Sequence, residues 1–200
     1  MKRTCFAILL CMLFGIMLSI PAVNGQEDEP ELPKVPASLK DREFVLPAKP
    51  NMKAKVYFIY QSRYACSICV AEAPEIVKTY KSMKKSKSAE LIMLNIDKDT
   101  ATAAKWAKDV KMKFPIVAPG KAEGIPFPYD GAGLLPMMVA VDAAGNKLGQ
   151  ANGGDVAEFL KTWKKYVREV TQKEKEEAKA AKKKAPADQD QTEQEETEQE

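Results

Sequence analysis

The sequence predicts an α/β protein in which a mixed central β-sheet is covered by helices. Two observations lead to this fold class. Short apolar runs alternate with helical patterns in the first half of the chain, and a hairpin followed by one more helix completes the second half. Alternating strands and helices build parallel strands, whereas a hairpin adds antiparallel ones. Residues 51–171 are expected to form one domain, because about 120 residues are enough for one core and too few for two.

The first half of this domain supplies two strands and two helices. The runs Lys55–Tyr60 (KVYFIY) and Leu91–Ile96 (LIMLNI) are rich in strand-forming residues. One helix is expected to start near Cys66, and another at Asp99 or Thr100, either of which can cap it. Helical spacing places these residues inward: Cys69, Val70, Ala73, Ile76, Val77, Tyr80 and Met83 in the first helix, and Ala103, Trp106, Ala107 and Val110 in the second.

The second half supplies a short strand, a hairpin and a last helix. Phe114–Val117 is the expected short strand, and the hairpin pairs Met137–Val141 with Lys147–Gln150. Asp155 followed by Glu158 resembles a capping box, which predicts a helix start at this point. The residues of this helix expected inward are Val156, Phe159, Leu160, Trp163, Val167 and Val170.

Residues 1–25 have the pattern of a secretory signal peptide. Lys2 and Arg3 precede an apolar run over Cys5–Ile20, and small residues flank an expected cleavage after Gly25. The run is shorter than the roughly 20 apolar residues of a spanning helix. We therefore expect a periplasmic or secreted protein whose mature chain has no stable membrane span, with an uncleaved anchor as the alternative.

Two further segments flank the domain. Residues 26–50 are polar and contain five prolines, so they are expected to form an extended linker without a core of its own. Residues 172–200 are charged and almost free of large apolar side chains, which predicts a disordered or frayed helical tail. The acidic end of this tail, from Asp188 onward, has seven acidic residues and no basic one.

The composition indicates that any reaction of this protein uses its cysteine thiols. The formal charge is +3 and falls to +1 without Lys2 and Arg3, so no nucleic-acid partner is expected. The absence of histidine removes the usual general base and the usual zinc or copper ligand, and no metal or other cofactor is expected. Once the signal peptide leaves, Cys66 and Cys69 are the only cysteines, and together they form a CxxC motif.

This spacing favours a redox-active pair over a structural disulfide. The nucleophile of disulfide exchange is a thiolate, and a sulfur at a helix start gains up to ~2 kcal/mol from the free amides and the helix dipole. Cys66 would occupy this place, and Cys69, one turn deeper, would resolve the mixed disulfide. A purely structural disulfide between the two cysteines would contribute little, because closing so short a loop stabilises the folded state by only about 2 kcal/mol.

The string CSICVAEAP, from Cys66 to Pro74, and a later proline before a hairpin, Pro136, resemble the thioredoxin superfamily. The string is similar in particular to the CxxCxxExP signature of exported TlpA-like thiol-disulfide oxidoreductases, and the match runs over residues 53–170. The resemblance implies a thioredoxin-like fold in which Glu72 moves a proton for the pair. It also implies that Pro136 follows a cis peptide bond and that Leu135 and Pro136 bind the substrate backbone.

The sequence departs from the family pattern in ways that leave the direction of electron transfer open. Ala65 stands where a tryptophan is usual, Ser67 and Ile68 replace Gly-Pro, Tyr60 stands in place of a buried aspartate, and residues 118–134 are a Gly/Pro-rich insertion. The expected function is exchange of disulfides with protein thiol or disulfide substrates in the reductase direction, with a separate redox partner protein. The alternatives are an oxidase, a binding module with an inert disulfide, and a Cu(I) carrier using two thiolates.

Overall fold

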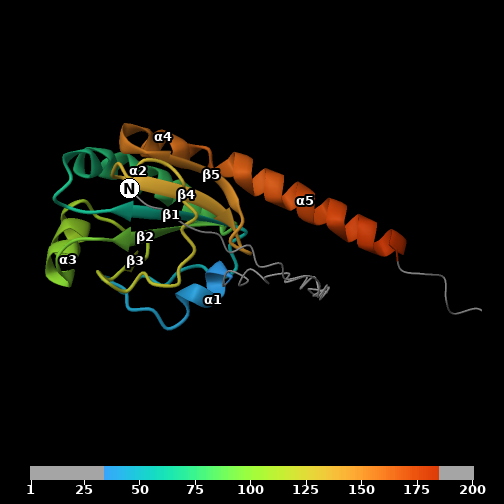
Figure 1. The fold of residues 1–200 in the computed structure, drawn as a ribbon, viewed down its shortest axis with the longest axis horizontal. Coiled ribbons are helices and arrows are strands. Elements are labelled where there is room, and N and C mark those ends of the chain that lie inside the picture. The colour runs from blue at the N-terminus through green and yellow to red at the C-terminus, as the bar shows by residue number, and fades with distance from the viewer. Residues whose placement is uncertain (1–33, 185–200) are drawn as a thin grey trace, which may run out of the picture. The chain divides into compact units, whose positions relative to one another are not determined.

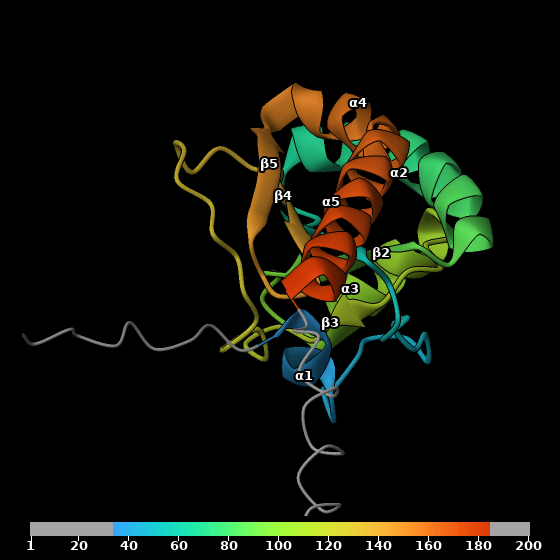
Figure 2. The same cartoon turned by 90° about the vertical axis from the view of Figure 1, so that its right-hand side faces the viewer.

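The structure, a computed structural model, describes residues 34–184 (Figures 1 and 2). Its five strands form one sheet in the order β3-β2-β1-β4-β5. The pairs β1–β2 and β2–β3 are parallel, whereas β1–β4 and β4–β5 are antiparallel, which confirms the predicted mixed sheet. The strands are β1 (Val56–Ser62), β2 (Ala89–Asn95), β3 (Ile116–Val117), β4 (Met137–Asp142) and β5 (Lys147–Asn152). The predicted signal peptide and the acidic end of the tail lie outside the described residues.

Helices lie on both sides of this sheet, with α2 and α4 on one face and α1 on the other (Figure 1). The described helices are α1 (Val35–Leu39), α2 (Ser67–Ser86), α3 (Thr100–Asp109), α4 (Val156–Lys161) and α5 (Trp163–Lys184). The side chain of Asp99 caps α3 by accepting a hydrogen bond from Thr102 N, as one of the two expected caps. A short 3-10 turn, Gly153–Asp155, precedes α4.

Strand β1 divides the core into two apolar clusters. Phe58 and Tyr60 pack with α2 and α4 in one cluster, and Tyr57 and Ile59 pack with α1 in the other. All four side chains are fully buried. Alternate residues of a strand point to opposite faces, so a sheet covered on both faces needs apolar residues at every position. This requirement explains the uninterrupted apolar run that identified β1 in the sequence.

The folded unit begins before residue 51, so the prediction of an extended linker over residues 26–50 is wrong for its described part. Val35 and Leu39 of α1 are buried against the sheet. Phe44 forms an isolated antiparallel β-bridge with Val117 of β3. The expectation of a linker rested on the polar character and the five prolines of residues 26–50. Pro36 instead lies in the first turn of α1, where proline is well tolerated because its missing amide hydrogen has no partner in a helix anyway.

The last helix is divided in two, which the sequence pattern did not predict. Helix α4 ends at Lys161 with Thr162 as its C-cap, and α5 then runs from Trp163 to Lys184. Residues 172–184, expected to be disordered or a frayed helix, form the second half of α5. Its first half packs near β1, and Lys55 of the segment before β1 pairs with Glu174. Residues 172–182 are all exposed, and Lys173 and Glu177 form an ion pair one turn apart along this surface.

Candidate active site

Cys66 forms the N-cap of α2, immediately after the loop that follows β1. Its backbone is extended (φ −101°, ψ 114°), and its sulfur accepts a hydrogen bond from the backbone N–H of Cys69 at 3.2 Å. A sulfur in this position replaces the hydroxyl or carboxylate oxygen that usually caps a helix. The sulfur thereby accepts from one of the backbone N–H groups that the first turn of a helix leaves without a helical partner.

Cys69 lies one turn further into α2, and no part of it is exposed to solvent. Burial raises the pKa of the Cys69 thiol to about 11, and its hydrogen bond with Cys66 adds to the rise. Both cysteines are free thiols, and Cys66 is half-buried. The two sulfurs therefore differ in the way that an attacking and a resolving cysteine would require.

The peptide bond between Leu135 and Pro136 is cis, as the resemblance implied. The sheet explains its place beside Cys66: β4 starts at Met137, which is paired with Gln61 at the end of β1. The Cys66 thiol donates a long hydrogen bond to the carbonyl oxygen of Leu135, with 3.8 Å between the sulfur and the oxygen. The structure thus brings together Cys66, Cys69 and the Leu135–Pro136 loop.

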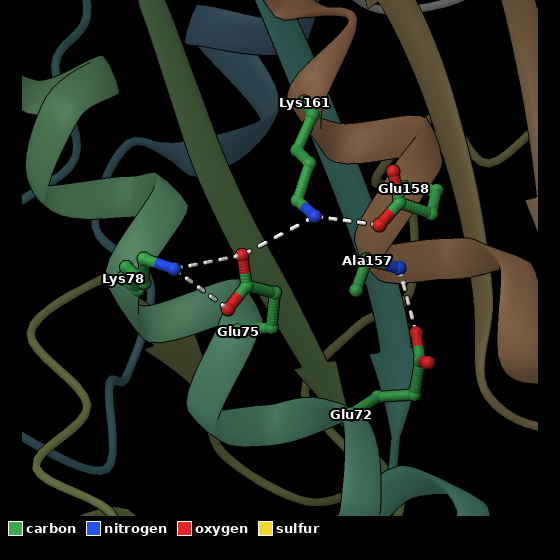
Figure 3. Close-up of polar contacts among 6 residues, drawn as sticks. All are labelled: Glu72, Glu75, Lys78, Ala157, Glu158 and Lys161. Atoms are coloured by element: carbon green, nitrogen blue, oxygen red, sulfur yellow. Dashed lines mark hydrogen bonds and ion pairs between the residues drawn. The ribbon is translucent and has the colours of Figure 1, made fainter.

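Glu72 extends from α2 toward the start of α4 (Figure 3). Its carboxylate accepts a hydrogen bond from the backbone N–H of Ala157 at 2.6 Å. Helix α4 starts directly after Asp155, as predicted, but Asp155 makes no side-chain cap, and the Glu72 carboxylate binds an amide of the first turn. The sequence could not show this contact, because the two residues are 85 positions apart. The proton-transfer role of Glu72 remains a prediction.

A second carboxylate of α2 also joins this helix to α4. Glu75 forms ion pairs with Lys78 on its own helix and with Lys161 on α4, each at 3.3 Å (Figure 3). Hydrogen bonds from Lys161 and Lys78 lower the pKa of Glu75. Helix α2 is thus held to α4 through two consecutive turns.

The loop before Cys66 is held by the end of β2, a contact that sequence analysis missed. Asp97 accepts hydrogen bonds from the backbone N–H of Tyr64 and from the side-chain amide of Asn95, both at 2.8 Å. The Tyr64 ring in turn lies against Trp106 of α3, with 6.1 Å between the ring centroids. The available signal was the two polar residues Asn95 and Asp97 at the end of the apolar run LIMLNI, since such residues at the end of a parallel strand face the loops of the site.

Apolar side chains are exposed near Cys66 and next to the Leu135–Pro136 loop. Tyr64, Ile68, Val70 and Leu134 are 44%, 46%, 36% and 63% exposed. Val70 had been expected inward, and this prediction is wrong: the inward face of α2 passes through Cys69 and Ala73, and Val70 lies beside it. Exposed apolar surface of this kind suits contact with another polypeptide.

The 118–134 insertion contains no helix or strand and runs from β3 to β4. Its rings Phe127 and Tyr129 stack with 5.9 Å between their centroids, and Asn152 of β5 donates a hydrogen bond to the Tyr129 hydroxyl at 2.6 Å. A cavity of about 630 Å³ opens between this part of the insertion, β5 and α4. Neither cysteine lines the cavity, so it is separate from the thiol pair.

Within residues 34–184, no three or more Cys, Asp or Glu side chains gather in a way that would hold a metal ion. No helix in this part of the chain combines the length and the apolar character needed to span a bilayer.

No protein-family model matches the chain, and no curated protein matches it. Several solved structures are similar to it. StoA from Bacillus subtilis is 23% identical, with 56% of this chain and 84% of that chain covered and a TM-score of 0.48. A thiol:disulfide interchange protein from Bacteroides sp. is 21% identical, with coverage of 55% and 73% and a TM-score of 0.45. The thioredoxin domain of a thiol-disulfide oxidoreductase from Bacteroides vulgatus is 23% identical, with coverage of 57% and 81% and a TM-score of 0.46.

These identities and scores are low, so the topology and the geometry of this chain itself identify its fold. Three parallel strands and an antiparallel hairpin form the sheet, and a CxxC pair opens the helix that follows the central strand. A cis proline precedes the strand next to it. By these features the chain has a thioredoxin-like fold.

Proposed function

We propose that this chain is an exported protein thiol-disulfide oxidoreductase in which Cys66 attacks and Cys69 resolves. One observation carries the proposal: the sulfur of Cys66 caps α2 and accepts the Cys69 amide at 3.2 Å, while Cys69 itself is fully buried. A thiolate at the first position is stabilised without a basic side chain, which suits a chain without histidine. Export is supported by the signal-peptide pattern of residues 1–25.

In the reductase direction, the Cys66 thiolate attacks one sulfur of a substrate disulfide. A mixed disulfide forms, and the other substrate sulfur leaves as a thiolate and takes up a proton. The Cys69 sulfur then loses its proton and attacks Cys66. This second step forms the Cys66–Cys69 disulfide and releases the remaining substrate thiol, so that two electrons have passed to the substrate. A separate dithiol protein restores the reduced pair.

Leu135, Pro136 and Glu72 have supporting roles in this proposal. The Leu135 carbonyl lies next to Cys66 and can accept a hydrogen bond from the backbone of an extended substrate, with Pro136 shaping the loop. Glu72 lies one helical turn after Cys69, from which it can exchange a proton when the buried thiol ionises. Its carboxylate accepts a hydrogen bond from the backbone N–H of Ala157, which fixes the position of the side chain.

The test is reduction of insulin disulfides by dithiothreitol with and without the purified protein, followed as turbidity. The unsubstituted protein should accelerate the reaction, Cys66→Ser should abolish the acceleration, and the matched control Ser67→Ala should retain it. Equilibration with glutathione buffers then gives the reduction potential. A reduction potential of about −270 mV fits a reductase, and one of about −120 mV fits an oxidase. Absence of acceleration would mean that the pair is inert and the domain binds a partner instead.

A further inference from the structure

Two buried hydroxyls beside the thiol pair have no hydrogen-bond partner. Three buried side-chain polar atoms in the described part of the chain share this property, and two of them are the hydroxyl oxygens of Tyr60 and Ser62. Both residues are fully buried at the end of β1, on the strand face that packs against α2. An unpaired buried hydroxyl is costly, so two of them in one place require an explanation.

The groups around these hydroxyls identify what they face. The ionisable groups that act on the Tyr60 hydroxyl are Cys69, Glu72 and Cys66. The Ser62 hydroxyl lowers the pKa of Tyr60 and the pKa of Cys69, yet its geometry gives no hydrogen bond with either residue. Tyr60 belongs to the same apolar cluster as Cys69. The two donors thus lie at the buried end of the site, on the side of the resolving sulfur.

We propose that the hydroxyls of Tyr60 and Ser62 are a donor pair for the Cys69 thiolate. They have no partner while Cys69 is a thiol, and they hydrogen-bond its sulfur when the sulfur ionises to resolve the mixed disulfide. The inference rests on the proposed function and extends it to two residues that would contact a reacting atom. The chemistry of the step is unchanged: Cys69 loses a proton, its sulfur bonds to that of Cys66, and the substrate sulfur leaves with the electron pair.

Tyr60 is suited to donate a hydrogen bond and unsuited to act as a base. Burial raises the pKa of Tyr60 well above its ordinary value, and negative charge on Cys69, Glu72 or Cys66 raises it further. The phenol therefore keeps its proton over the working pH range, and the proton of Cys69 must go to Glu72 or to water. A hydrogen bond to a charged sulfur is stronger than one to a neutral thiol, so the pair would stabilise the thiolate selectively.

The test uses Ellman's disulfide, because the reduced protein should release two thionitrobenzoate ions from it in sequence. The first release reports attack by Cys66, and the second reports resolution by Cys69. Tyr60→Phe and Ser62→Ala should leave the first release unchanged and slow the second about 3- to 10-fold each. Losing one such hydrogen bond lowers the thiolate fraction about 10-fold or more, and the higher nucleophilicity of a more basic sulfur recovers part of that loss.

Tyr57→Phe is the matched control, since Tyr57 is a buried tyrosine on the same strand whose hydroxyl binds Asn51 O on the opposite side of the sheet. It should change neither release. Thermal unfolding of the reduced protein separates this proposal from a structural role. Removing an unpaired hydroxyl should not lower the unfolding midpoint, whereas removing one held by a buried water should lower it.

Equal second-release rates in Tyr60→Phe, Ser62→Ala and the unsubstituted protein, at every pH from about 6 to 9, would overturn the inference. A lower midpoint with an unchanged second release would also overturn it. Failure of the proposed function gives a different result, because then the unsubstituted protein itself would show no second release.

Discussion

The two sulfurs of the site differ in how far water reaches them. Cys66 is half-buried at the tip of α2, whereas Cys69 is fully buried and its pKa is raised to about 11, chiefly by burial. A thiol that stays protonated and covered reacts slowly with alkylating reagents. We expect iodoacetamide at neutral pH to modify Cys66 first, as measured by mass spectrometry of the digested protein. In Cys66→Ser, the remaining Cys69 should stay unmodified over the same interval, and faster labelling of Cys69 would reverse the two roles.

At Glu72, a structural and a chemical role can be separated by two substitutions. Glu72→Gln keeps an oxygen for the Ala157 amide and removes the titration, whereas Glu72→Ala removes both. We expect Ala to lower the free energy of unfolding by about 0.5–2 kcal/mol, the usual cost of a lost cap, and Gln to lower it by less. If Glu72 also carries the proton, Gln should slow resolution of the mixed disulfide several-fold or more, up to about 100-fold.

Glu75→Gln is the matched control, because Glu75 lies one turn further along α2 and also contacts α4. It should leave the rate of resolution unchanged. If Glu72→Gln resolves the mixed disulfide as fast as the unsubstituted protein from acid to alkaline pH, Glu72 serves α4 alone and water carries the proton.

The first residues of β2 contain a buried carboxylate that makes the stability of the sheet depend on pH. Glu90 is 4% exposed and accepts hydrogen bonds from the backbone N–H groups of Asn51 and Leu91 at 2.8 and 2.9 Å. Burial nevertheless raises the pKa of Glu90. The folded state thus holds this proton more tightly than the unfolded state. The stabilisation is complete below pH about 4.3, the pKa of a glutamate in the unfolded chain. It is lost as the pH rises through the raised pKa of Glu90 in the folded state.

Urea unfolding of the unsubstituted protein and Glu90→Gln across this range tests the effect. The quantity to compare is the free energy of unfolding of the unsubstituted protein minus that of Glu90→Gln. This difference should fall as the pH rises from about 4 toward neutrality. The comparison cancels carboxylates such as Asp99 and Asp130, whose pKa values are lowered and which act in the opposite sense. A difference that does not change with pH would show that Glu90 ionises equally easily in both states.

The elements also show where sequence reasoning succeeds and where it stops. Strands β1 and β2 were predictable because both faces of the sheet are covered, which forces unbroken apolar runs. The start of α2 was predictable because Cys66 caps it locally. The cap of α4 was not, since its carboxylate comes from Glu72 on another helix. Helix α1 was missed because its prolines, taken alone, fit a linker as well as a helix start.

At the scale of the whole molecule, charge is unevenly distributed along the chain. Residues 34–184 contain 29 basic and 17 acidic side chains, whereas residues 188–200 contain seven acidic and none basic. Truncation after Ala187 should leave the unfolding midpoint and the disulfide-exchange rate nearly unchanged, because the removed segment has no apolar residue to bury. Thermal unfolding and the insulin assay would measure both. A marked loss that disappears at high salt would show instead that the acidic end binds the basic domain.

The order of elements along the chain allowed the mixed sheet to be predicted, and the resemblance placed the thiols and Pro136 near one another. The path of the 118–134 insertion was not predictable, because single tertiary contacts hold it. Arg42 donates hydrogen bonds to the carbonyl oxygens of Lys121 and Glu123, and Asn152 holds Tyr129. Contacts of this kind join distant residues and leave no periodic pattern in the sequence.

The exposed second half of α5 has a practical consequence for handling the protein. Glu174 pairs with Lys55, and the ten residues from there to Lys184 would measure about 15 Å as a helix. In Figure 1 this part of α5 points away from the end of β1 that leads to the cysteines. A protein immobilised on a bead or sensor surface through a group attached after Lys184 would therefore present its thiol pair to the solution, with a helical spacer between the surface and the domain.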